Sequence, residues 1–112
     1  MIHPEVERHL PAIQSACRAF GVKRLEIFGS AATTAFEPGR SDVDFLVTYP
    51  DSYDFGDFGA RLFRFEERLT SILGRPAHVV MDSALTKRRF REQVDRTRML
   101  IYDATTDSRV VA

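Results

Sequence analysis

The sequence predicts a single small domain of the α/β (α+β) class, in which a short mixed β-sheet carries helices mainly on one face. Its 112 residues suffice for one hydrophobic core but not for two. With 44% hydrophobic and 11% aromatic residues, the composition excludes a disordered chain. Helical and strand periodicities alternate along the chain without an internal repeat. We therefore expect one domain over residues 1–112, with about 1–10 and 105–112 loosely ordered.

The first half of the chain predicts one helix and two strands. Apolar residues recur every three or four positions up to Gly21, which predicts a helix over residues 11–20 after a looser turn. Residues 22–28 and 42–49 are rich in β-branched and aromatic side chains, which favours two strands. The small and polar residues between them predict a loop over residues 30–40, with room for one helical turn.

The second half predicts two helices and two strands. An apolar stripe at spacings of 4, 3, 4 and 3 residues begins at Phe58 and predicts a long helix that ends at Gly74. Residues 77–81 predict a third strand, residues 86–97 a further helix and residues 99–102 a last strand. The remaining tail is expected to fray.

Charge and cysteine content narrow the class of protein. Sixteen Lys and Arg balance sixteen Asp and Glu, so no overall basic surface favours direct binding of nucleic acid. Cys17 is the single cysteine and lies on an apolar helix stripe, which predicts a core residue in a reducing compartment. No apolar run has the length of a signal or membrane-spanning segment. We expect a soluble, cytoplasmic domain without membrane partners.

The pattern that carries chemistry is Gly29-Ser30, followed after a loop by the run SDVD at residues 41–44. Side chains alternate along a strand, so Asp42 and Asp44 point to the same face, roughly 7 Å apart. Two adjacent carboxylates repel each other unless a cation or a proton intervenes. Mg²⁺ prefers such a set, one or two carboxylates completed by substrate phosphates.

The glycine and serine of this pattern complement the acidic pair. A glycine at a strand end lets phosphate oxygens approach the backbone, where N–H groups and the Ser30 hydroxyl can donate hydrogen bonds. The two strand ends together predict a nucleoside-triphosphate site with metal-assisted phosphoryl chemistry. Each half alone is also common in solvated turns; their combination at this spacing favours the functional interpretation.

At these residues the sequence resembles the minimal nucleotidyltransferases of the DNA polymerase β superfamily, whose signature is a GS followed by an (S)DxD pair. The likeness extends over nearly the whole chain, through FGS at 28–30, SDVDFLV at 41–47, LGRP at 73–76 and LIYDA at 100–104. It implies a polymerase-β-like nucleotidyltransferase fold. It also implies transfer of a nucleoside monophosphate from a metal-bound NTP, such as ATP, to a hydroxyl acceptor, with release of pyrophosphate.

The same resemblance implies site residues and a partner. The triphosphate would be held by Gly29, Ser30 and Ser41, and the metal, Mg²⁺ or Mn²⁺, by Asp42 and Asp44. Small members of the family are similar to antitoxins that are paired with HEPN-domain ribonuclease toxins, some of which they inactivate by adenylylating a tyrosine. A HEPN-type protein is therefore the expected partner.

The sequence departs from the family pattern at two places. After GS the family usually has a small-Ala-Arg-Gly run, whereas residues 31–34 read AATT and contain neither the Arg nor the second Gly. The strand after LGR usually carries a third carboxylate, and His78 occupies that position here. Asp82 lies roughly 13 Å further along an extended strand, too far to replace it. His78 would accept a proton from the attacking hydroxyl or, in a decayed site, have no catalytic role.

Three classes of function follow. A metal-dependent nucleotidyltransferase acting on a partner protein is favoured by the GS and DxD residues. A catalytically degenerate transferase fold, acting as a non-enzymatic antitoxin or protein-binding module, is favoured by His78 and by residues 31–34. A polymerase or repair domain is disfavoured by the balanced charge.

Two further segments each have two interpretations. Residues 85–98 carry six basic and two acidic side chains, which suits an acidic partner or, the interpretation we favour, a solvated helix face. The aromatic residues of segment 49–58 would either contact a base or a partner beside the active site, or fill the edge of the core.

Overall fold

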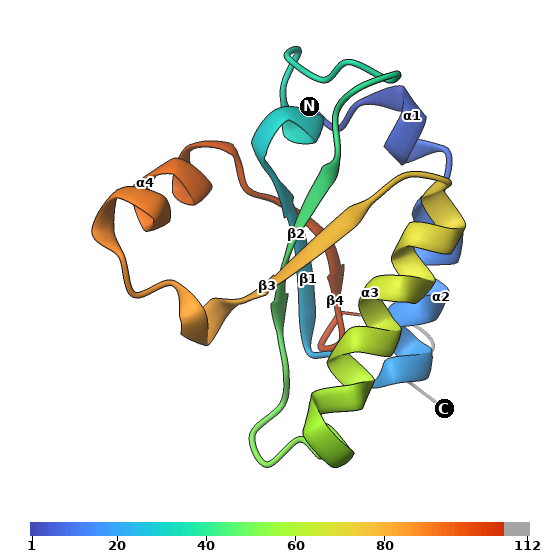
Figure 1. Ribbon diagram of the computed structural model, residues 1–112, viewed down its shortest axis with the longest axis vertical. Coiled ribbons are helices and arrows are strands. Elements are labelled where there is room, and N and C mark those ends of the chain that lie inside the picture. Colours follow the sequence, from blue (N-terminus) through green and yellow to red (C-terminus); the bar gives the residue numbers. More distant parts are fainter. Residues whose placement is uncertain (107–112) are drawn as a thin grey trace.

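The computed structural model describes residues 1–106, which fold around a four-stranded mixed β-sheet (Figure 1). The strands lie in the order β3-β2-β1-β4. β1 is antiparallel to both of its neighbours, whereas β3 runs parallel to β2. Each predicted strand is present, with its ends within two residues of the predicted ones: β1 (Arg24–Phe28), β2 (Val43–Thr48), β3 (Ala77–Met81) and β4 (Met99–Asp103).

The helices cover the sheet unequally, as predicted. α2 (Leu10–Phe20) and α3 (Ala60–Leu73) lie together on one face, while α4 (Arg88–Thr97) projects on the other side (Figure 1). The turn expected before the first predicted helix contains a short helix instead, α1 (Pro4–Glu7). The side chain of His3 starts it, because its Nδ1 accepts a hydrogen bond from the Glu5 N–H. None of the helices in the described part of the chain is long and apolar enough to cross a membrane.

Three short 3₁₀ turns connect these elements. η1 (Gly29–Ala32) follows β1 and is the helical turn expected in the loop of residues 30–40. η2 (Asp57–Gly59) precedes α3, and η3 (Asp82–Ala84) follows β3. Most of the C-terminal segment that was predicted to be loosely ordered, residues 107–112, lies outside the described residues.

The main core lies between the sheet and helices α2 and α3. Ile13 from α2, Leu25 from β1, Phe45 from β2 and Phe65 from α3 are fully buried in it. Cys17 belongs to the same cluster, which confirms it as a core residue. Burial away from water raises the pKa of the Cys17 thiol to about 12, because the thiolate loses its hydration.

A second, smaller cluster lies on the opposite face, beneath α4. Phe28, Leu46, Leu85 and Val94 form it. Strand alternation places Asp44 on the same face as Leu46. The acidic pair therefore lies on the face that α2 and α3 leave free, and α4 covers only part of it (Figure 1).

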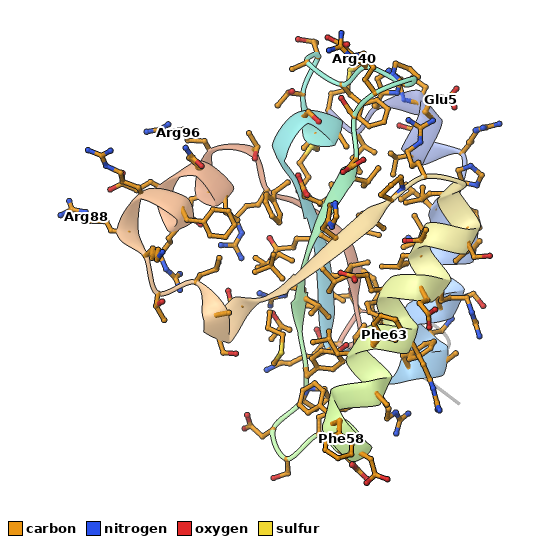
Figure 2. All side chains as sticks on the ribbon, in the orientation of Figure 1. Glu5, Arg40, Phe58, Phe63, Arg88 and Arg96 are labelled. Atoms are coloured by element: carbon orange, nitrogen blue, oxygen red, sulfur yellow. The ribbon has the colours of Figure 1, made fainter. Side chains whose placement is uncertain are left out.

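The predicted start of the long helix is wrong. Phe58 fits the apolar stripe by spacing, but α3 begins only at Ala60 and Phe58 is fully exposed at the tip of the molecule (Figure 2). Gly56 and Gly59 adopt positive φ values of 75° and 71°, and Phe58 itself has φ 53°, so the backbone is not helical there. The rest of the stripe packs on the core as predicted.

Candidate functional site

The end of β1 and the start of β2 meet at the predicted motif residues. Phe28 pairs with Asp44 in the antiparallel register, so Gly29 directly adjoins Asp44. Gly29 has φ 76°, a conformation that favours glycine. A Cβ atom at this position would lie 3.0 Å from Oδ2 of Asp44. The bare backbone of the glycine therefore faces the carboxylate without an intervening side chain.

The parallel neighbour β3 brings His78 to the same place. Asp44 pairs with His78 in the register of β2 and β3. His78 Nε2 lies 3.0 Å from Asp42 Oδ2. The side chains of Asp42 and His78 are 46% and 55% exposed, whereas Asp44 is half-buried. Three residues singled out from the sequence thus form one cluster that is open to solvent on one side.

The electrostatics of the cluster are unbalanced toward negative charge. Burial raises the pKa of Asp44, and the charge of Asp42 raises it further, against the lowering effect of His78. The hydrogen bond to Asp42 raises the pKa of His78, and the charges of Asp42, Asp44 and Glu66 act in the same direction. Among the described residues, no Lys or Arg forms an ion pair with either aspartate. A cation at this position would relieve the repulsion between the two carboxylates.

The donor set fits a divalent cation that is completed by a substrate. Within residues 1–106 no group of three or more His, Cys, Asp or Glu side chains is arranged to hold a metal. Asp42 and Asp44 nevertheless supply two neighbouring carboxylates, and Mg²⁺ is commonly bound by one or two carboxylates together with phosphates and water. The residues present therefore fit Mg²⁺ in a ternary arrangement with a nucleotide.

The two predicted serines have different surroundings. Ser30 follows Gly29 at the start of η1, and its carbonyl accepts hydrogen bonds from the N–H and the hydroxyl of Thr33. Thr33 thus caps η1 within the run where the family usually has its Arg. Ser41 closes the preceding loop, since its Oγ accepts a hydrogen bond of 3.0 Å from the Glu37 N–H. Ser41 shapes the entry into β2, while Ser30 stands beside the glycine.

Helix α4 forms a second wall beside the cluster, which the sequence reasoning missed by treating this segment as a solvated face. A pocket of about 390 Å³ separates the helix from the ends of β1 and β2. The signal for it was a helix face with aromatic and small polar residues among the basic ones. The pocket is lined by Phe28, Gly29 and Asp44 from the sheet side and by Phe90, Gln93, Arg96 and Thr97 from α4.

The aromatic segment after β2 does not belong to this site. Tyr49, Tyr53 and Phe55 pack on one another, with ring centroids 4.4 to 4.9 Å apart. The Tyr53 hydroxyl donates to the Phe20 carbonyl. The segment leaves the far end of β2, roughly 16 Å along the strand from Asp44 at about 3.3 Å per residue. Of the two interpretations of this segment, the one that places its aromatics beside the GS and DxD residues does not hold, and Tyr49 packs against the core instead.

The fold and the cluster together define the class of protein. A mixed sheet places a GS turn against an acidic pair, on the face that is free of the two long core helices. This is the arrangement implied by the resemblance to minimal nucleotidyltransferases. The sequence profile of the nucleotidyltransferase domain matches residues 12–110. The chain belongs to this nucleotidyltransferase domain family.

Three solved structures share the fold. A protein assigned as a minimal nucleotidyltransferase is 27% identical, has a TM-score of 0.68 and covers 88% of this chain and 95% of its own. A chain of a toxin–antitoxin structure with AMP-PNP is 18% identical and has a TM-score of 0.66. The match covers 90% of this chain and 78% of that chain. A chain from the structure of a tri-AMPylated Shewanella oneidensis HEPN toxin in complex with an MNT antitoxin is 16% identical, with a TM-score of 0.62. That match covers 93% of this chain and 77% of the other. These matches confirm the predicted minimal nucleotidyltransferase fold. The sequence has no significant match among curated proteins.

Proposed function

We propose that this chain transfers a nucleoside monophosphate from a Mg²⁺-bound NTP to a hydroxyl of a partner protein, a tyrosine of a HEPN-type toxin. The observation that carries the proposal is the meeting of the GS turn with the acidic pair: Gly29 directly adjoins Asp44, and a Cβ atom at position 29 would crowd Oδ2 of Asp44 at 3.0 Å, so this position favours a residue without a side chain. Two solved structures with the same fold support the choice of substrate and partner. One is a toxin–antitoxin complex with AMP-PNP, and the other contains an AMPylated HEPN toxin.

The two aspartates and the glycine would bind and orient the nucleotide. Asp42 and Asp44 hold the divalent cation, which when bound supplies positive charge to the phosphates during transfer. Gly29 presents backbone without a side chain beside Asp44. Because its own N–H donates to Thr97 Oγ1, the Ser30 hydroxyl would be a donor to the phosphates next to it. The half-buried position of Asp44 fixes this side of the site on a rigid strand.

The transfer step is a displacement at the α-phosphorus. The acceptor oxygen forms a bond to this phosphorus, the bond to the oxygen that bridges to the β-phosphate breaks, and pyrophosphate leaves with its electron pair. The proton of the acceptor hydroxyl passes to a base, and we assign this role to His78. When Nε2 carries the proton that is donated to Asp42, Nδ1 of the neutral imidazole is free to accept one.

A second candidate function, without catalysis, is supported by the contact between His78 and Asp42. Because His78 Nε2 lies 3.0 Å from Asp42 Oδ2, one oxygen of a proposed metal ligand is hydrogen-bonded to the imidazole. A chain in which this contact persists would bind its partner without transferring a nucleotide. That is the non-enzymatic antitoxin or protein-binding module, and it predicts partner binding with no covalent product.

Radiolabelled ATP distinguishes the two functions. The chain is incubated with Mg²⁺, the protein product of the neighbouring gene, and ATP labelled at either the α- or the γ-phosphate. Nucleotidyl transfer labels the partner from α-labelled ATP only, whereas phosphoryl transfer would label it from γ-labelled ATP. Asp44→Asn is expected to abolish labelling. Asp82→Asn, just beyond the end of β3 opposite His78, is the matched control that retains it. Complex formation without label from either ATP would support the non-enzymatic module.

A further inference from the structure

The pocket between α4 and the sheet adjoins the proposed metal site, and one of its lining residues is an arginine without an ion-pair partner among the described residues. Gly29 and Asp44 line it from the sheet side, and among the lining residues that the structure describes Arg96 is the one Lys or Arg. Arg96 is exposed, and within residues 1–106 no hydrogen bond or ion pair holds its guanidinium. An arginine in this state can form bidentate hydrogen bonds with phosphate oxygens.

Three contacts hold α4 in place relative to this site. The Gly29 N–H donates to Thr97 Oγ1 at 2.8 Å. Arg98 forms a bidentate ion pair with Glu26 of β1, with N–O distances of 2.8 and 2.7 Å. The ring of Phe90 meets the ring of Phe28 edge-on, with centroids 6.0 Å apart. The backbone at Arg96 is therefore fixed next to the GS turn rather than free to move away.

The charge balance of the proposed site calls for one more cation. Two ionised aspartates and one Mg²⁺ sum to zero, which leaves the negative charge of the triphosphate uncompensated. Residues 31–34 read AATT and supply no basic side chain where the family usually has an Arg. We propose that Arg96 binds the triphosphate, so that α4 forms the second wall of the nucleotide site. This inference rests on the proposed function.

The same pocket accommodates the rest of the nucleotide. The side chain of Phe90 is 36% exposed and lines the pocket, so part of its ring is available to a nucleobase. Phe90 and Arg96 are six residues apart, roughly 9 Å along the axis at about 1.5 Å per residue. This separation is comparable with the length of a nucleoside from its 5′-phosphate to its base. The base stacks on Phe90 while the phosphates meet Arg96.

Calorimetric titration with two ligands tests the assignment. Mg²⁺-ATP and Mg²⁺-tripolyphosphate are titrated into the wild type, Arg96→Gln, Phe90→Leu and the control Arg88→Gln. Arg88 and Arg96 lie on the same helix (Figure 2). Arg88 pairs with Glu92 and is not among the described residues that line the pocket. Arg96→Gln is expected to weaken both ligands at least about tenfold. Phe90→Leu should weaken ATP alone, and Arg88→Gln should leave both affinities unchanged.

The outcomes separate this inference from the proposed function. Thermal melts first establish that each variant is folded. Binding of Mg²⁺-ATP that Asp44→Asn abolishes and Arg96→Gln leaves intact would overturn the role of Arg96 alone. Equal weakening by Arg96→Gln and Arg88→Gln would also overturn it, because the effect would then come from general charge. A wild type that binds neither ligand would contradict the proposed function itself.

Discussion

Replacing Gly29 by alanine tests the contact on which the proposed site depends. Alanine at φ 76° has a left-handed backbone conformation that costs roughly 1–2 kcal/mol. Its Cβ would also lie 3.0 Å from Asp44 Oδ2, closer than ordinary van der Waals contact, so the carboxylate has to move. Gly29→Ala should therefore destabilise the fold and displace a proposed metal ligand.

Gly74→Ala is the matched control. Gly74 ends α3 with φ 68°, and an added Cβ there meets no atom of residues 1–106 within 4 Å. The backbone cost is thus similar, and both variants should unfold at lower temperature, by roughly 4–8 °C for each kcal/mol in a domain near this size. Only Gly29→Ala is expected to lower the affinity for Mg²⁺-ATP, at least about tenfold, or about 1.4 kcal/mol.

The assay combines thermal melts of the unliganded variants with calorimetric titration of Mg²⁺-ATP. The difference between the two variants in affinity isolates the contact with Asp44 from the backbone strain that they share. If Gly29→Ala and Gly74→Ala bind Mg²⁺-ATP equally well, the nucleotide does not bind beside Gly29 and Asp44, and the reasoning is refuted.

The remaining predictions concern the helix anchor, the core and the third site residue. Glu26→Gln leaves the buried side of Arg98 without its ionic partner and should lower the free energy of unfolding by about 1.5–3 kcal/mol in urea melts; no change would show that the pair is not a structural anchor. Cys17, with its pKa raised to about 12, should resist alkylation at pH 8 until the protein unfolds; rapid labelling of the native state would contradict its burial. His78→Asp adds a third carboxylate, so it should melt lower without Mg²⁺ and gain more from added Mg²⁺ than the wild type; equal gains would place residue 78 away from the metal.

Much of the fold could be predicted from the sequence because its periodicities are strong. The alternation in β2 and the apolar stripe of α3 are local patterns, and each carries its own register. The start of α3 could not be predicted in this way. Phe58 matches the stripe by spacing, but the backbone from Gly56 to Gly59 is not helical, so α3 begins only at Ala60. The spacing of apolar residues in the sequence does not determine the backbone conformation of the residues between them.

The site could be predicted where its residues are neighbours in the chain. Asp42 and Asp44 share a face through strand alternation alone. The approach of His78 to Asp42 depends on the parallel register of β3 on β2, which no local pattern encodes. The sequence signalled only that His78 stands at a motif position.

The position of α4 beside the site was the feature that sequence patterns could predict least. It depends on contacts between residues far apart in the chain: Gly29 with Thr97, 68 positions away, and Glu26 with Arg98, 72 positions away. The many charged residues of α4 are typical of a solvated helix face. Four residues of the helix line the pocket because these contacts place α4 beside the sheet.

The central claim is that a metal-bound nucleotide lies where Gly29, Asp44 and His78 meet. Paramagnetic broadening of backbone amide signals by Mn²⁺-ATP locates the ion directly, since the effect falls steeply with distance from the metal. We predict that the strongest loss of signal occurs at these three residues, extends to Thr97 on α4, and disappears in Asp44→Asn. Broadening centred on the aromatic segment of residues 49–58, or spread evenly over the surface, would contradict the claim.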